Sequence, residues 1–207
     1  MGSTPSRLDG GTFAGGVRAA LPVVLGYLSL GLAAGVVQRG AGLSVVEIAL
    51  LSLCLYAGAA QFITAGMVAA GSPLGAIVTT VFFVNLRNLL FALALAPRLG
   101  RIRPWLGFVI GAQLTDETFA MASAHGDEGR LAAPWMLGLN LSAYVAWALA
   151  NVAGALAGDL IERWVWLGGL DFALPAMFGA LLVLQLERQR YSLPALTVLL
   201  LAAAVAV

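Results

Sequence analysis

Three ionisable residues lie deep inside long uncharged stretches of this 207-residue sequence. Arg87 stands 11 residues before the next charge, Arg98, and the adjacent acids Asp116 and Glu117 are surrounded by another apolar run. A guanidinium and a carboxylate at such depth form an ion pair, hold a polar solute or pass a proton. Adjacent helical residues point about 100° apart, so at most one of the two acids can face the same partner as Arg87.

Other kinds of chemistry find little support in the residue types. The sequence has one histidine, His125, and one cysteine, Cys54, too few for a zinc site or for a nucleophile paired with a base. We therefore expect no enzyme, no metal and no cofactor. The formal net charge of +1 predicts no attraction to nucleic acid.

The composition predicts an all-α integral membrane protein. Hydrophobic residues make up 61% of the chain and charged residues 10%, and the mean hydropathy is +0.95. Soluble domains average roughly 45–50% apolar and about 25% charged residues, so this chain has too few charges to cover a water-soluble surface. The apolar runs are continuous rather than alternating, which favours membrane helices over a barrel.

Apolar stretches long enough for helical crossings recur along the chain. The uncharged run 48–86 would be about 58 Å long as one helix, nearly twice the membrane core, so we expect a break at Gly71-Ser72-Pro73. After a polar tail, residues 1–16, residues 17–207 form a single transmembrane domain. We predict six or seven transmembrane or re-entrant segments, near 19–38, 44–70, 74–96, 104–124, 134–158 and 171–186, with a last apolar run to 207.

The distribution of the arginines along the chain indicates which ends of these segments face the cytoplasm. If all six cross fully, the eleven basic residues divide 5 to 6 between the two sides, which decides nothing under the positive-inside rule. The cluster Arg98, Arg101 and Arg103 is the strongest cytoplasmic marker. If this arginine cluster and the N-terminus lie on the same side of the membrane, one of the segments between the N-terminus and the cluster must be re-entrant. The candidate is 44–70, whose Ala57-Gly58-Ala59-Ala60 stretch is a weak point for a helix.

Two short patterns indicate an internal repeat with broken helices. Pro-x-x-Leu-Gly begins at Pro22 and returns 112 residues later, and Ala-x-x-Ala-x-Phe begins at Ala57 and returns 116 residues later. Interrupted segments at matching places in two halves are typical of transporters whose site lies between the repeats. The helix breaks would be Gly58 in one half and Pro175 in the other.

The buried charges admit two interpretations. In one, Arg87 and one acid form an ion pair that only holds the bundle together. In the other, they line a pathway for a polar solute or a proton. A zwitterion with an apolar tail would suit such a site, because its carboxylate can meet Arg87 or a helix N-terminus and its ammonium a carboxylate.

Five blocks of sequence carry a resemblance to a known family. They are QRGAGLS (38–44), YAGAAQF (56–62), NLRNLL (85–90), TDETFA (115–120) and LDFALPA (170–176). In this order they resemble the AzlC family of bacterial branched-chain amino acid permeases, the large subunits of two-component amino acid exporters. The family's polar signature positions fall here on Gln61, Asn85, Arg87, Asp116 and Glu117.

The resemblance implies a secondary transporter of the bacterial inner membrane that exports leucine, isoleucine, valine or related apolar amino acids. It implies coupling to the proton gradient and a small AzlD-type membrane subunit as partner. Compared with typical members, the last crossing is expected to be shortened or missing. Two alternatives stay open: a transporter or channel for another small polar solute, and a structural membrane subunit without a pathway of its own.

Overall fold

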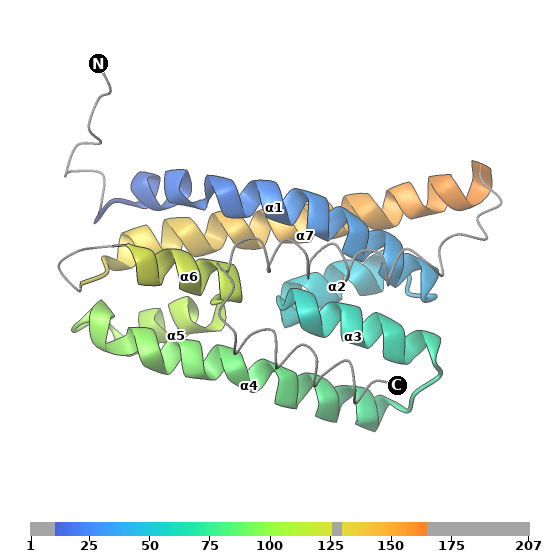
Figure 1. Cartoon of the computed structure of the whole chain (residues 1–207), viewed down its shortest axis with the longest axis horizontal. Coiled ribbons are helices and arrows are strands. Elements are labelled where there is room, and N and C mark those ends of the chain that lie inside the picture. Colours follow the sequence, from blue (N-terminus) through green and yellow to red (C-terminus); the bar gives the residue numbers. More distant parts are fainter. Residues whose placement is uncertain (1–10, 126–129, 165–207) are drawn as a thin grey trace, which may run out of the picture. The chain divides into compact units, whose positions relative to one another are not determined.

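All regular structure in the part of the chain that the computed structural model describes, residues 11–125 and 130–164, is helical (Figure 1). This confirms the predicted all-α membrane class. The helices are α1 (Phe13–Gly40), α2 (Val45–Leu55), α3 (Gly58–Ala69), α4 (Leu74–Leu99), α5 (Pro104–Ala112), α6 (Asp116–Ala124) and α7 (Ala133–Trp164). The first turn of α1 lies within the stretch expected to be a polar tail.

Three of the described helices are long and apolar enough to cross a membrane: α1, α4 and the part of α7 from Ala133 to Gly158. With 28, 26 and 26 residues they span about 39–42 Å at about 1.5 Å per residue, enough for a hydrocarbon core of about 30 Å. The other described helices have 9 to 12 residues, or about 14–18 Å, and reach only halfway.

Helices α1 and α7 pack against each other through glycines. A Cβ atom built at Gly16 would overlap the backbone of Trp135, and one at Gly35 would overlap the backbone of Asn151. On the other helix, Gly154 lies equally close to Leu32 of α1. The contacts advance together along both helices, so α1 and α7 run parallel at backbone distance.

Helix α4 runs the opposite way. The N–H of Leu131, two residues before α7, donates to the carbonyl of Arg98 at 2.8 Å. The end of α4 therefore lies at the start of α7, and its beginning lies on the side of the membrane where α1 ends. This direction decides the path of the short helices on either side of α4.

Helices α2 and α3 form a re-entrant pair. Ser44 and Glu47 form a capping box that starts α2 just after α1 ends, and the helix stops at Tyr56, whose φ of 20° interrupts it. Helix α3 starts at Gly58 and leads back, through residues 70–73, to the start of α4. The pair thus enters and leaves on one side, as was predicted for segment 44–70, with the break beside Gly58 (Figure 1).

The segment predicted near 104–124 has these bounds in the structure, but it consists of two helices separated by a break that was not predicted. Helix α5 ends at Ala112 and α6 begins at Asp116, because Thr115 caps α6 and forms a capping box with Thr118. Helix α6 ends at Ala124, and the ring of the next residue, His125, stacks on Trp135 at the start of α7 with centroids 3.9 Å apart. Helices α5 and α6 are therefore a second re-entrant pair, entering from the opposite side (Figure 1).

The described helices contain an inverted repeat at a shorter interval than the sequence patterns indicated. A crossing helix followed by a re-entrant pair occurs twice in opposite directions, with starts at 13, 45 and 58 and again at 74, 104 and 116. The two Pro-x-x-Leu-Gly patterns lie on the parallel helices α1 and α7. The recurrence near 173–178, with the expected break at Pro175, lies outside the described residues.

The glycine contacts between α1 and α7 give a stability prediction. Gly35→Ala should lower the free energy of unfolding by about 1–3 kcal/mol, since the neighbouring backbone of Asn151 cannot move aside as a flexible side chain would. Gly26→Ala, in the same helix with open space around it, is the matched control. Thermal unfolding of both variants in detergent measures the difference. Equal stability of the two would contradict backbone-distance packing.

Candidate functional site

The middle of each crossing helix carries a polar or aromatic side chain, and both helix breaks lie beside these positions. Tyr27 is residue 15 of the 28 in α1, Arg87 is residue 14 of the 26 in α4, and Trp147 is residue 15 of the 26 in the crossing part of α7. The first break contacts Trp147 at Gly58, and the second contacts Tyr27 at Thr115. These residues therefore meet near the membrane midplane.

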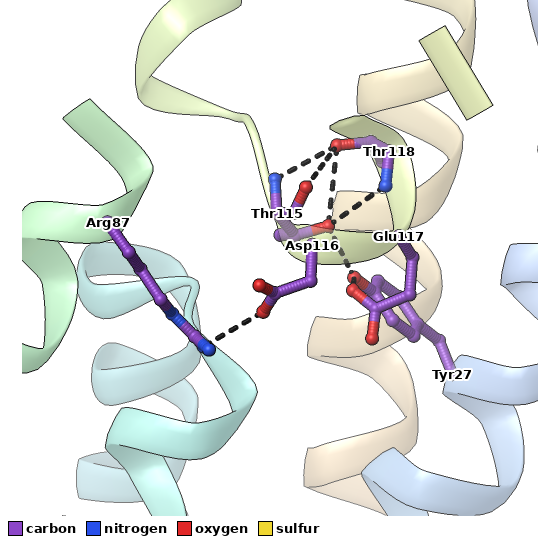
Figure 2. A network of polar contacts seen from close by, with 6 residues as sticks. All are labelled: Tyr27, Arg87, Thr115, Asp116, Glu117 and Thr118. Atoms are coloured by element: carbon purple, nitrogen blue, oxygen red, sulfur yellow. Dashed lines mark hydrogen bonds and ion pairs between the residues drawn. The ribbon is translucent and has the colours of Figure 1, made fainter. Parts of the chain in front are cut away.

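Arg87 forms an ion pair with Asp116. The Nη2 atom of Arg87 lies 2.9 Å from Oδ2 of Asp116, and the two side chains are 38% and 47% exposed. Asp116 is the first residue of α6, so its carboxylate also lies at the positive end of that short helix. Figure 2 shows the side chain of Asp116 pointing toward α4.

Glu117 points toward a different partner, as adjacent helical positions require. The hydroxyl of Tyr27 donates to Oε2 of Glu117 at 2.6 Å and lies 2.7 Å from Oγ1 of Thr115 (Figure 2). Among the described residues, no cation forms an ion pair with Glu117. Near the membrane midplane, the described residues thus include two acids, Asp116 and Glu117, and one arginine, Arg87, which pairs with Asp116.

Gln61 and Gly58 join this site through Trp147. The indole Nε1 of Trp147 donates to Oε1 of the fully buried Gln61 at 3.1 Å, and the indole ring covers Gly58. The same ring meets the ring of Tyr27 edge to face, with centroids 5.1 Å apart. Trp147 therefore connects the first re-entrant pair to the hydroxyl group that contacts Glu117.

Polar atoms without partners gather at this level. Nine solvent-shielded side-chain atoms of the described residues have no hydrogen-bond partner, and six of them lie at a break or at the middle of α4. Buried polar groups in proteins are normally satisfied by protein, water or ligand. The six belong to Tyr56, Gln61, Asn85, Arg87, Asn88 and Gln113.

The site residues predicted from sequence divide into three groups. Arg87 and Asp116 pair directly, and Glu117 and Gln61 lie on either side of Tyr27 and Trp147. Asn85 lies half-buried two residues from Arg87, with an unpartnered Oδ1.

Four residues of the site were missed: Tyr27, Tyr56, Thr115 and Trp147. A signal for Thr115 was present, because a threonine followed by two acids is typical of a helix start. The aromatic residues gave no such signal, since their spacing along the chain says nothing about their meeting.

The arrangement can neutralise and hold a small charged molecule. A carboxylate at membrane depth is costly unless it is paired or protonated, and among the residues that the structure describes Glu117 contacts the hydroxyl of Tyr27 and no cation. A proton or the cationic group of a solute would balance it. The described residues contain no cluster of three or more His, Cys, Asp or Glu side chains for a metal ion.

Three crossing helices, two opposed re-entrant pairs and a polar centre define a multi-pass helical membrane protein. The chain belongs to the AzlC protein family, whose sequence profile matches residues 22–161. It is 32% identical over 193 residues to the inner membrane protein YgaZ of Escherichia coli K12, covering 90% of this chain and 79% of that protein.

Two further relatives widen the comparison. An uncharacterized membrane protein of Archaeoglobus fulgidus is 33% identical over 177 residues, covering 84% of this chain and 76% of that protein. The branched-chain amino acid transport protein AzlC of Bacillus subtilis is 27% identical over 182 residues, covering 86% of this chain and 69% of that protein. No solved structure matches the chain. The predicted family and membrane location are confirmed, and the family is linked to branched-chain amino acid transport.

The ion pair predicts non-additive effects on stability. Arg87→Gln leaves Asp116 without its cation, so it should destabilise the protein more in the wild-type background than in the Asp116→Asn background. We expect a coupling energy of about 0.5–3 kcal/mol from a double-mutant cycle of unfolding measurements in detergent. Arg101→Gln, an exposed arginine of the loop after α4, is the control. Additive effects within error would refute a coupled pair.

Proposed function

We propose that this protein is a secondary transporter that exports branched-chain or other apolar amino acids in exchange for protons. The observation that carries this proposal is a set of polar atoms that have no hydrogen-bond partner within the described part of the chain. They surround Glu117, which pairs with no described cation, at the level where two inverted re-entrant pairs meet. In transporters built from inverted repeats, substrate and coupling ions bind near the midplane at discontinuous helices.

An α-amino acid carries the positive charge that no described residue brings to Glu117. Its ammonium group can neutralise Glu117, as a charge-assisted hydrogen bond in place of a proton. The buried Phe62, one residue beyond Gln61 on α3, offers an apolar contact for a branched side chain. The transport of branched-chain amino acids named for the Bacillus subtilis relative agrees with this class of substrate.

Exchange for protons follows from competition at one acid. Glu117 can be neutral with a bound proton or paired with an ammonium group, but one carboxylate does not hold both. Loading the amino acid on one side therefore releases a proton, and unloading it on the other takes one up. An inward proton gradient then drives amino acid efflux. The Arg87–Asp116 pair can open and close as the re-entrant pairs move.

A small AzlD-type membrane subunit is part of the proposal, on the strength of the family resemblance. Helix α4 leaves much of its apolar surface exposed among the described residues, including Phe82, Phe83 and Leu90. Such a face requires lipid or another membrane helix. We expect the small subunit to be needed for full transport activity.

Replacement of Glu117 tests the proposed transport. Glu117→Gln keeps the shape but loses the charge, so export should fall by roughly tenfold or more and lose its dependence on the proton gradient. Cells that express the chain with its small subunit are loaded with dipeptides, and free leucine and valine are measured outside.

The control for this variant is Glu47→Gln, an exposed capping residue of α2 where glutamine can also cap. Normal proton-dependent export by Glu117→Gln would remove Glu117 from the mechanism. No export by the wild-type pair above empty cells would remove the proposed function itself.

The described arginines favour one orientation, with the start of α1 in the cytoplasm. Arg18, Arg98, Arg101, Arg103 and Arg130 lie toward that side, whereas Arg39 lies toward the other. Under the positive-inside rule, the first re-entrant pair then enters from outside and the second from the cytoplasm.

Cysteine labelling in intact cells tests this orientation. In a Cys54→Ser background, Ala41→Cys should react with a membrane-impermeant maleimide, because the loop between α1 and α2 would face outward. Arg101→Cys should react only after the membrane is opened. The reverse labelling pattern would invert the proposed orientation.

A further inference from the structure

One face of α4 contacts α6 along the length of the short helix. Arg87, Phe91 and Arg98 are separated by four and seven positions, so they lie on the same side of α4. Arg87 pairs with Asp116 at 2.9 Å, and one turn further along the ring of Phe91 stacks on that of Phe119 with centroids 4.4 Å apart. Arg98 lies at the other end of this face. Because the contacts advance together, α6 runs parallel to α4.

Arg98 binds the last turn of α6 through its backbone. Its Nη1 atom donates to the carbonyls of Ala122 at 3.0 Å and Ser123 at 3.3 Å, and its Nη2 atom donates to the carbonyl of His125 at 2.6 Å. The last four carbonyls of a helix have no partner within it, and they form the negative end of the helix dipole. A guanidinium group suits this end, because several of its N–H groups can donate at once.

Further contacts hold the same end of α6. The ring of His125 stacks on Trp135 of α7, and the carbonyl of Arg98 accepts from the N–H of Leu131 just before that helix. The opposite end of α6 is held to α4 by the Arg87–Asp116 ion pair, whose side chains are 38% and 47% exposed. An ion pair with this exposure is weak and easily opened. The end at Arg98 is therefore the more firmly attached of the two.

We propose that Arg98 is a positioning residue for the transport site, which fixes α6 to α4 so that Glu117 keeps its place when the Arg87–Asp116 pair opens. This inference rests on the proposed function, in which that pair opens and closes. Helix α6 has nine residues, and a helix this short depends on its contacts for stability. Glu117 lies in its first turn, so the 2.6 Å contact with the hydroxyl of Tyr27 depends on how the whole helix is held. Arg98 thus acts on the solute through α6, without touching it.

A double-mutant cycle tests this role, because two connections that hold one helix should compensate for each other. The purified chain with its small subunit, in detergent, is titrated with leucine. Arg98→Gln should raise the Kd for leucine about threefold in the wild-type background. In the Asp116→Asn background, where α6 has lost its ion pair with α4, the same change should raise the Kd about tenfold or more.

Two further substitutions serve as controls. Arg98→Lys keeps a cation beside the carbonyls but loses the planar fork, so it should raise the Kd less than Arg98→Gln in both backgrounds. Arg101→Gln, in the loop after α4, should leave the Kd unchanged in both. Thermal unfolding is measured for every variant. If Arg98→Gln with Asp116→Asn does not fold, Arg98→Lys in the same two backgrounds gives the comparison, with a smaller difference in the same direction.

The outcomes separate the two claims. If substitution of Arg98 raises the Kd by the same factor in both backgrounds, or lowers the unfolding temperature without changing the Kd, Arg98 has no positioning role, although the transporter remains. A wild-type complex that binds neither leucine nor valine would remove the proposed function, and this role with it.

Discussion

A charge at the centre of a membrane must be balanced, and this requirement organises the molecule. Arg87 has Asp116, at the start of a short helix that ends at midplane. Glu117, the next residue, has only the hydroxyl of Tyr27 among the described residues. The paired charges can hold the two helices together, whereas none of the described residues brings a cation to the second acid. Adjacent positions on one helix thereby take two different roles.

The breaks in the helices follow from the same constraint. A broken helix exposes backbone N–H and C=O groups, which are tolerated at membrane depth only where protein or a polar site satisfies them. Around this centre, α1 and α7 contact each other at backbone distance through glycines and leave little room for relative movement. The re-entrant pairs are shorter and meet the crossing helices through individual side chains.

Hydropathy along the chain encodes the crossing helices more clearly than it encodes the breaks between the short ones. Uncharged runs located the three crossing helices, and the need for one cytoplasmic arginine cluster led to the re-entrant path of segment 44–70. The break at Thr115 was missed, because the run 104–124 is mostly apolar up to the acids and its length alone fits one crossing. A capping box at Thr115 starts the second of its two short helices. This is a local signal in the sequence, but it is weaker than hydropathy.

The sequence by itself determined the membrane class, the crossing helices, and the fact that Arg87 could pair with at most one of Asp116 and Glu117. These depend on hydropathy and on the fixed turn of a helix, both local properties. Only the tertiary structure decided which acid pairs with Arg87. It also decided that Tyr27 and Trp147 lie between Glu117 and Gln61. Contacts between residues 86 to 90 positions apart depend on how helices pack, which spacing along one chain does not specify.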